Sequence, residues 1–261
     1  MDKLIVVKIG GNIIDDEKKL SAFLKQFASI SGYKILVHGG GKMATRLAEQ
    51  LNIPQQLVEG RRITDAETLK IITMIYAGTI NKNIVSLLQC YKCNALGLTG
   101  ADGNAILAHK RSDSGIDYGF AGDIDEINVN LFQSLLLQGI TPVLNPVTHD
   151  GRGQFLNTNA DTIAQETARS LGKHFETTLV YLFEKPGVLL DIKDEGSVIQ
   201  QLTAIDYFEL KSNGVISEGM IPKLDNAFRA LESGVNKVII GKAEELLQLI
   251  KGEQGTTIST N

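Results

Sequence analysis

The chain has 261 residues, a length that allows one large domain or two lobes. Its 43% hydrophobic and 21% charged residues are typical of a globular protein and exclude a disordered tail, a collagen and a coiled coil. Lysine and arginine number 26 against 30 aspartate and glutamate, and this net charge of -4 argues against a nucleic-acid partner.

The chain opens on an apolar run that indicates a buried strand rather than a targeting segment. The run Leu4–Val7 has only four residues, too few for the core of a signal peptide. No stretch approaches the roughly 20 apolar residues that a membrane-spanning helix needs. We therefore expect a cytoplasmic protein without a membrane partner.

Short apolar runs alternate with longer amphipathic ones along most of the chain. Runs without polar alternation are typical of strands covered on both faces, and strand–helix alternation predicts an α/β fold around a parallel sheet. The expected strands are Leu4–Ile9, Lys34–His38, Ala95–Thr99, Thr141–Asn145, Leu179–Phe183 and Lys237–Gly241. The expected helices are Glu17–Ile30, Lys42–Leu51, Ala66–Gln89, Asn130–Gln138, Asp161–Leu171 and Ile221–Ser233.

Two segments depart from this alternation. The segment Asp102–Ile127 is rich in glycine and aspartate and contains short apolar runs, which predicts hairpins inserted beside the main sheet. The tail Gly252–Asn261 is polar, and we expect it to be a fringe outside the core.

Glycines collect just after the expected strands, as Gly10-Gly11, as Gly39–Gly41, and as Gly97 with Gly100. Ligands of a parallel sheet bind at the carboxyl ends of its strands. Glycine there lets backbone N–H groups approach an anion, and helix N-termini add partial positive charge. One glycine pair is often only a tight turn, but three clusters at one edge predict a shared anion site.

Other motifs point to weaker alternatives. Gly39–Ala44 fits a loose dinucleotide fingerprint with Glu59 about 20 residues on, although such proteins normally place the fingerprint after the first strand. Cys90 and Cys93 form a C-x-x-C at the end of an expected helix, which favours two small semi-buried thiols over a redox pair. The four histidines are scattered, so no metal site is expected.

Charged and amide residues accompany the glycine clusters. Lys8 lies near the end of the first strand, beside Gly10-Gly11, where a buried charge needs a partner. Lys223 lies at a helix start, where it opposes the helix dipole and calls for an anion unless it is simply solvated. Asn157–Asp161 holds more amide and carboxyl groups than a helix N-cap requires, and Asp161 is placed to hold lysine ammonium groups.

The order and spacing of these motifs resemble those of the amino-acid kinase family over essentially the whole chain. Aspartate kinases, a sister group, usually continue with a Ser/Thr-rich segment where this chain has Asn12. The motifs that carry the resemblance are Lys8–Gly11, Val37–Gly41, Gly60–Thr64, Gly78–Lys82, Asn157–Asp161 and Gly219–Lys223.

The resemblance implies a three-layer αβα sandwich around a mainly parallel open sheet. It also implies transfer of the γ-phosphoryl group of ATP, supplied with Mg²⁺, to the side-chain carboxylate of N-acetyl-L-glutamate or a close N-acyl-glutamate, in arginine biosynthesis. Residues 1–172 would form a lobe that binds the acylglutamate and dimerises, and residues 173–261 a lobe that binds ATP. Because only seven residues precede Lys8, we expect a homodimer without arginine feedback.

The resemblance also implies roles for individual residues. Lys8 and Lys223 would stabilise the charge of the transferring phosphoryl group, with Asp161 orienting both. Arg62 would pair with the substrate α-carboxylate, for which its planar fork is suited. The other implied substrate-binding residues are Gly40, Gly41, Asn157 and Asn159. The implied nucleotide-binding residues are Lys8, Gly10, Gly11, Glu184, Gly187, Val188, Ser217 and Lys223.

Two departures and two alternatives remain. Glu218 precedes Gly219, where relatives often have Gly or Asp. The family usually has an Asp-Val-x-Gly turn for the nucleotide, where this chain reads Glu-Lys-Pro-Gly over residues 184–187. A sister kinase acting on aspartate, free glutamate or carbamate is one alternative. A metabolite sensor that kept the fold without turnover is the other, although it would have no use for Lys8, Asp161 and Lys223 together.

Overall fold

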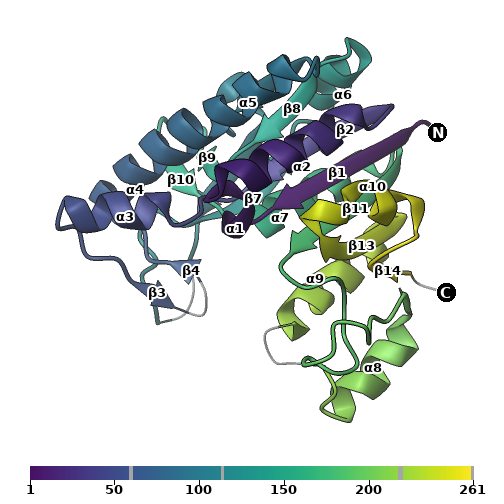
Figure 1. Cartoon of the computed structure of the whole chain (residues 1–261). Coiled ribbons are helices and arrows are strands. Elements are labelled where there is room, and N and C mark those ends of the chain that lie inside the picture. The colour runs from purple at the N-terminus through teal and green to yellow at the C-terminus, as the bar shows by residue number, and fades with distance from the viewer. Residues whose placement is uncertain (59–60, 113–114, 217–219, 260–261) are drawn as a thin grey trace.

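The computed structural model describes residues 1–58, 61–112, 115–216 and 220–259, and Ser217 lies outside them. Figure 1 shows a long twisted sheet with helices on both sides. Its strands are β1 (Lys3–Ile9), β2 (Tyr33–His38), β5 (Ala95–Leu98), β8 (Thr141–Leu144), β11 (Glu176–Phe183), β12 (Gln201–Leu202), β13 (Lys237–Lys242) and β14 (Thr256–Ile258). All six strands expected from the sequence are among them.

Adjacent strands of this main sheet run in the order β12-β14-β13-β11-β1-β2-β8-β5. The pairs from β13 through to β5 are parallel, whereas β14 is antiparallel to β13. The carboxyl ends of β11, β1 and β2 therefore meet at one edge, where the glycine motifs Gly10-Gly11 and Gly39–Gly41 follow their strands. The sheet continues without a break across residue 172, because β11 pairs with β1.

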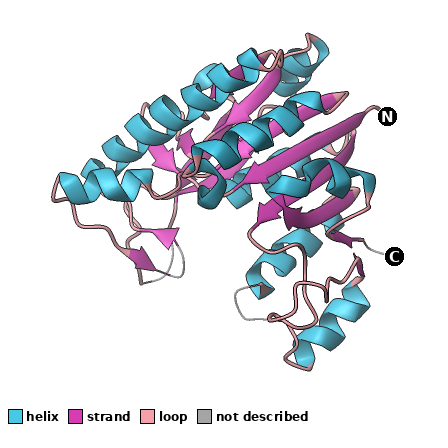
Figure 2. Ribbon diagram, viewed as in Figure 1, coloured by secondary structure: helices cyan, strands magenta, loops and turns pink. Residues whose placement is uncertain are grey.

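Helices cover both faces of the main sheet (Figure 2), and buried apolar residues form two cores. They are α1 (Gly11–Ile14), α2 (Glu17–Ser29), α3 (Met43–Gln50), α4 (Ala66–Ile72), α5 (Asn81–Cys90), α6 (Val129–Leu137), α7 (Ala160–Leu171), α8 (Ala204–Ser212), α9 (Ile221–Glu232) and α10 (Leu246–Lys251). One core lies under α6, α7 and α9, and the other under α2, α5 and α10. This confirms the three-layer αβα fold expected from the sequence.

The expected hairpin insertion forms part of a second sheet, with strand order β10-β9-β6-β7. Its strands β6 (Ile106–Lys110) and β7 (Gly122–Ile127) are antiparallel, as predicted for Asp102–Ile127. They are joined by β9 (Val147–His149) and β10 (Phe155–Asn157), and a separate ribbon consists of β3 (Leu57–Val58) and β4 (Arg61–Arg62). Short 3-10 turns span Asp102–Asn104 and Ala243–Glu245.

The expectation that the tail is a polar fringe is wrong. Within it, β14 pairs with β13 inside the main sheet, and the side chains of Thr256 and Ile258 are fully buried. Threonine is β-branched and favours strands, and its hydroxyl can be buried when it is hydrogen-bonded. The Thr256 hydroxyl accepts the backbone N–H of Val188 at 2.8 Å, so its burial leaves no polar group unpaired.

A continuous helical run, Ala66–Cys90, joins α4 to α5 through the π-helical segment Thr73–Ile80. By length and composition alone this run is apolar enough to cross a membrane, which the sequence analysis did not anticipate. A buried core helix passes the same test. Here Ile72, Ile84 and Leu88 are fully enclosed in the core on one face of the main sheet.

Candidate active site

Lys8 reaches the site because of the side-chain alternation along β1. Leu4 and Val6 pack in the core beneath α7, and Lys8 continues the same face one step beyond them. Its ammonium nitrogen Nζ lies 2.8 Å from Oδ1 of Asp161, in the first turn of α7. The Lys8 side chain is only 10% exposed, so this carboxylate compensates a largely desolvated charge.

The N-terminus of α7 holds Asp161 in place. The side-chain oxygen Oδ1 of Asn159 accepts the backbone N–H groups of Asp161 at 2.8 Å and Thr162 at 3.2 Å. Asn159 is thus the N-cap of α7. From the neighbouring strand β11, the Tyr181 hydroxyl donates to the backbone carbonyl of Asp161 at 3.2 Å.

Lys223 enters from α9 and approaches the same cluster. Its ammonium lies 4.0 Å from the ring centroid of Phe183, the last residue of β11. Burial lowers the pKa of Lys223, the carboxylate of Asp161 raises it, and the ammonium of Lys8 lowers it. The ammonium of Lys8 lies 5.8 Å from the same ring centroid, so Lys223 is near the Lys8–Asp161 ion pair.

The two glycine motifs pack against each other backbone to backbone. A Cβ on Gly11 would lie 2.7 Å from Cα of Gly41, a separation that no real Cβ tolerates. Gly41 also has a φ of +59°, which favours glycine. The carboxylate of Asp15 accepts the backbone N–H of Lys42 at 2.9 and 3.0 Å and so fixes the end of the second motif.

A glycine is needed at position 40 because Tyr76, on the π-helical segment, lies directly against its backbone. A Cβ on Gly40 would lie 1.8 Å from Cζ of Tyr76, so the tyrosine ring fills the space that a side chain would occupy. Tyr76 is buried and interacts with Arg62. A π-helical turn inside a longer α-helix is often found at a functional site, because it changes the direction in which side chains point.

Arg62 is held by polar side chains from two other segments. Its guanidinium donates hydrogen bonds to Oε1 of Gln55 and, at 3.0 Å, to the hydroxyl of Thr45. Asn157, at the end of β10, donates from Nδ2 to the Thr64 hydroxyl at 3.0 Å. These contacts fix both residues at the wall of one cavity.

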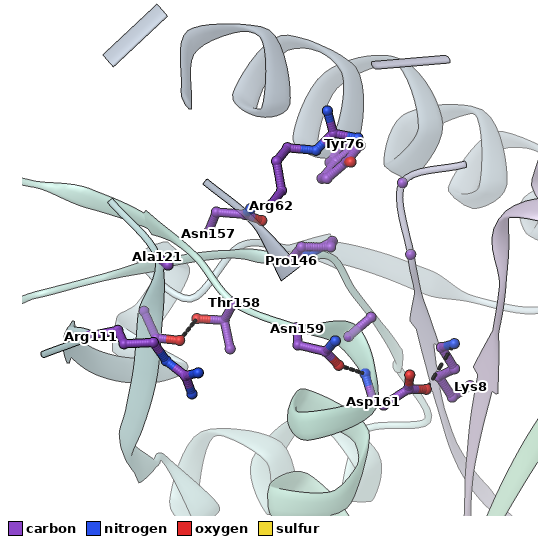
Figure 3. Close-up of a pocket in the computed structure, with 14 residues that line it drawn as sticks. Lys8, Arg62, Tyr76, Arg111, Ala121, Pro146, Asn157, Thr158, Asn159 and Asp161 are labelled. Carbon is purple, nitrogen blue, oxygen red and sulfur yellow. Dashed lines mark hydrogen bonds and ion pairs between the residues drawn. The ribbon is translucent and has the colours of Figure 1, made fainter. Parts of the chain in front are cut away.

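This cavity brings six of the predicted site residues together (Figure 3). The carboxylate of Asp161 and the ammonium of Lys8 lie at one end of the close-up and Arg62 with Tyr76 at the other. Its lining consists of Lys8, Gly39, Gly40, Arg62, Tyr76, Arg111, Ala121, Gly122, Pro146, Asn157, Thr158, Asn159, Ala160 and Asp161.

Two further cavities, which share Lys185 and Met220 in their linings, contain the predicted nucleotide-binding residues that the structure describes, apart from Lys8. Gly187 and Val188 line a mainly apolar cavity together with Ile192, Ile216 and Met220. The other is lined by Gly10, Gly11, Asn12, Leu182, Phe183, Glu184, Lys185, Met220 and Lys223. Ser217 cannot be placed with them because it lies outside the described residues.

The residues at the site that the sequence analysis missed include Tyr76, Arg111 and Phe183. Arg111 lines the cavity from the segment after β6, and its guanidinium forms an ion pair with both carboxylate oxygens of Asp123 on β7. The adjacent basic residues Lys110 and Arg111, beside an acidic strand, were the available signal. Their sequence positions do not indicate that the hairpin brings Arg111 to the cavity lined by Lys8 and Asp161.

His38, Cys90 and Cys93 are not among the residues that line the three cavities. His38 is fully buried, and burial lowers its pKa to about 4, so the ring is neutral at pH 7. Its Nδ1 contacts the Gly39 carbonyl at 2.8 Å. Cys90 is exposed and Cys93 buried, and both are free thiols. Within the part of the chain that the structure describes, no three His, Cys, Asp or Glu residues form a group that could hold a metal.

Comparison with known proteins identifies the family. Residues 3–242 match the family model described as "Amino acid kinase family". The chain belongs to the amino acid kinase family. Within that family, it is 56% identical to the acetylglutamate kinase of Cytophaga hutchinsonii, with 100% of both chains covered. It is 55% identical to that of Parabacteroides distasonis, covering 95% of this chain and 97% of the relative.

Solved structures show the same amino acid kinase fold. The protein smu.665 from Streptococcus mutans UA159 has a TM-score of 0.80 at 26% identity, with 99% of each chain covered. Carbamate kinase from Giardia lamblia, bound to AMP-PNP, has a TM-score of 0.72 at 14% identity, covering 100% of this chain and 99% of that one. At that identity the likeness shows the fold alone.

Proposed function

We propose that this chain uses ATP to phosphorylate the side-chain carboxylate of N-acetyl-L-glutamate, or of a close N-acyl-glutamate, in arginine biosynthesis. The observation that carries the proposal is the Lys8–Asp161 ion pair, which lines one cavity, with Lys223, which lines another, near the same Phe183 ring as Lys8. Relatives also support the proposal: proteins named acetylglutamate kinase match 94–100% of the chain at 52–56% identity.

The cavity between Lys8 and Arg62 fits the acylated amino acid. Its α-carboxylate would pair with the Arg62 guanidinium, which presents a planar fork to it. Its amide end would contact Asn157, with Asn159 nearby, and the backbone N–H groups of the Gly40-Gly41 segment would face the reacting carboxylate. The reacting carboxylate would then lie toward Lys8, at the opposite end of the same cavity.

The two cavities that share Lys185 and Met220 fit ATP. Backbone groups of Gly10 and Gly11, together with the ammonium of Lys223, would face the phosphates. Gly187 and Val188 border the mainly apolar cavity that would take the base, and we keep Glu184 and Ser217 as proposed contacts to the nucleotide. Mg²⁺ would arrive on the phosphates and keep several waters, as it usually does in kinases, which needs no dedicated protein cage.

The chemistry needs charge neutralisation and positioning more than covalent help. A carboxylate oxygen attacks the γ-phosphorus while the bond from that phosphorus to the ADP oxygen breaks, giving an acyl phosphate and ADP. A carboxylate is already ionised at pH 7, so no general base is required. The two lysines would neutralise the charge on the transferring group, whose transition state is loose.

The division of labour between the lobes is also a proposal. We assign acylglutamate binding and dimerisation to residues 1–172, and ATP binding to residues 173–261. The positions of the two kinds of cavity support this division only in part, because Gly10 and Gly11 line the cavity assigned to the phosphates. Sedimentation of the purified chain would test the homodimer.

Trapping of the product with hydroxylamine tests the proposed function directly. With Mg-ATP, a hydroxamate is expected from N-acetylglutamate or N-succinylglutamate, and none from free glutamate or aspartate. A signal from a free amino acid would move the chain to a sister kinase. Nucleotide binding with no trapped product from any substrate would favour the sensor alternative.

Arg62→Ala is expected to raise the KM for the acylglutamate about 10–100-fold with little change in kcat. A charge-assisted pair of this kind contributes about 1.5–3 kcal/mol, and here it would form equally in the ground and transition states. Steady-state kinetics at saturating ATP measures the effect. Arg152→Ala, on an exposed turn, is the matched control. A collapse of kcat at unchanged KM would instead place Arg62 in the chemical step.

A further inference from the structure

The ring of Phe183 lies beside both lysines of the proposed active site. Its centroid is 4.0 Å from the ammonium of Lys223 and 5.8 Å from that of Lys8. Both distances fall within the range of a cation–π interaction, about 6 Å from ring centroid to cation. Two positive charges therefore lie near one ring, and Asp161 forms its ion pair with Lys8.

The backbone explains why the ring lies there. Phe183 ends β11, and alternation places it on the same face as Leu179 and Tyr181, above the core that contains α7 and α9. Tyr181 is the direct neighbour of Lys8 across the parallel strand pair. The rings of Tyr181 and Phe183 are stacked, with centroids 6.1 Å apart and planes inclined by 18°.

This aromatic pair contacts all three residues of the cluster, Lys8, Asp161 and Lys223. Tyr181 donates its hydroxyl hydrogen to the backbone carbonyl of Asp161, while Phe183 presents its ring to the two ammonium groups. We infer that Phe183 is a positioning residue, whose ring holds the Lys223 and Lys8 ammonium groups at the reacting phosphoryl group. The inference rests on the proposed function, because it assigns the lysines to phosphoryl transfer.

The effect of the Phe183 ring on Lys223 can be measured through the pKa of that lysine. Lys8 on β1, Asp161 on α7 and Glu184 just after β11 all influence its pKa, and burial lowers that pKa most. The face of an aromatic ring favours the charged form of a lysine. Removal of the ring would therefore lower the Lys223 pKa further and leave less of the ammonium form at high pH.

Phe183→Leu tests this inference, because it removes the ring and keeps an apolar side chain. We expect kcat to fall about 2–30-fold, with less than about twofold change in either KM. The basic limb of the kcat profile and the Lys223 titration, followed by NMR of ¹³Cε-labelled lysine, should both move about 0.5–1.5 pH units toward acid. Lys223→Arg assigns the resonance.

Phe183→Tyr, which keeps the ring face, should have a kcat within about twofold of the parent. Its Lys223 should titrate at the same pH as in the parent. Phe208→Leu, an exposed phenylalanine on α8, is the control for loss of an aromatic ring elsewhere. If Phe183→Leu does not fold, Phe183→Met provides the same comparison. Unchanged kcat and an unchanged Lys223 titration would overturn the inference.

The NMR titration separates this inference from the proposed function. If the parent protein phosphorylates no acylglutamate but the Lys223 pKa still falls in Phe183→Leu, the proposed reaction fails while the ring–ammonium contact stands. If the parent is active and neither kcat nor the titration responds, the contact has no functional role.

Discussion

Replacement of either lysine by alanine is expected to lower kcat about 10²–10³-fold, the usual cost of removing one preorganised electrostatic donor. Lys8→Ala removes a charge that is 10% exposed and leaves the Asp161 carboxylate without the ammonium 2.8 Å away. Lys223→Ala removes the second charge, which comes from a different element, α9. The KM values should change much less than kcat, because the charge on the phosphoryl group is greatest during transfer.

The measurement is the rate of hydroxamate formation under saturating ATP and acylglutamate, for both variants. Lys70→Ala, whose lysine is 68% exposed on α4, should retain the parental rate. Asp161→Asn combined with Lys8→Ala should cost less than the sum of the two single effects, because the partners act as one unit. Near-parental turnover in Lys8→Ala or in Lys223→Ala would remove that lysine from the mechanism.

The position of Lys8 could be anticipated from the sequence for a clear physical reason. Strands that are buried on both faces form continuous apolar runs, and parallel strands place their carboxyl ends at one edge. Lys8, at the end of such a run, and Gly10-Gly11 after it therefore had to lie at that edge. Asp161 followed from the amide and carboxyl groups at the start of a predicted helix.

The residues that escaped prediction depend on contacts between layers. Periodicity indicates which face of a strand Phe183 occupies, but not that the ammonium of Lys223, from α9, lies over its ring. Tyr76 was hidden inside a run predicted as one regular helix, because the π-helical turn has no signal in the periodicity. In the tail, Thr256 counted as polar although its hydroxyl has a buried partner.

Gly11→Ala is expected to lower kcat/KM at least about 100-fold, although it adds a single methyl group. That methyl would lie 2.7 Å from Cα of Gly41, so one glycine motif must move away from the other. Backbone atoms cannot rotate away as a flexible side chain does, and overpacking of this kind costs about 1–3 kcal/mol of stability. The movement would displace backbone N–H groups proposed to face the phosphates and the reacting carboxylate.

Thermal unfolding and kinetics together test this contact. Gly78→Ala is the matched control, since a Cβ there meets no atom within 4 Å and the change suits a helix. We expect the control to keep both its Tm and its rate. In Gly11→Ala, a modest fall in Tm with a large fall in kcat/KM would show that the two motifs act through their close approach. Parental kcat/KM in a folded Gly11→Ala protein would show that the reaction does not depend on that approach.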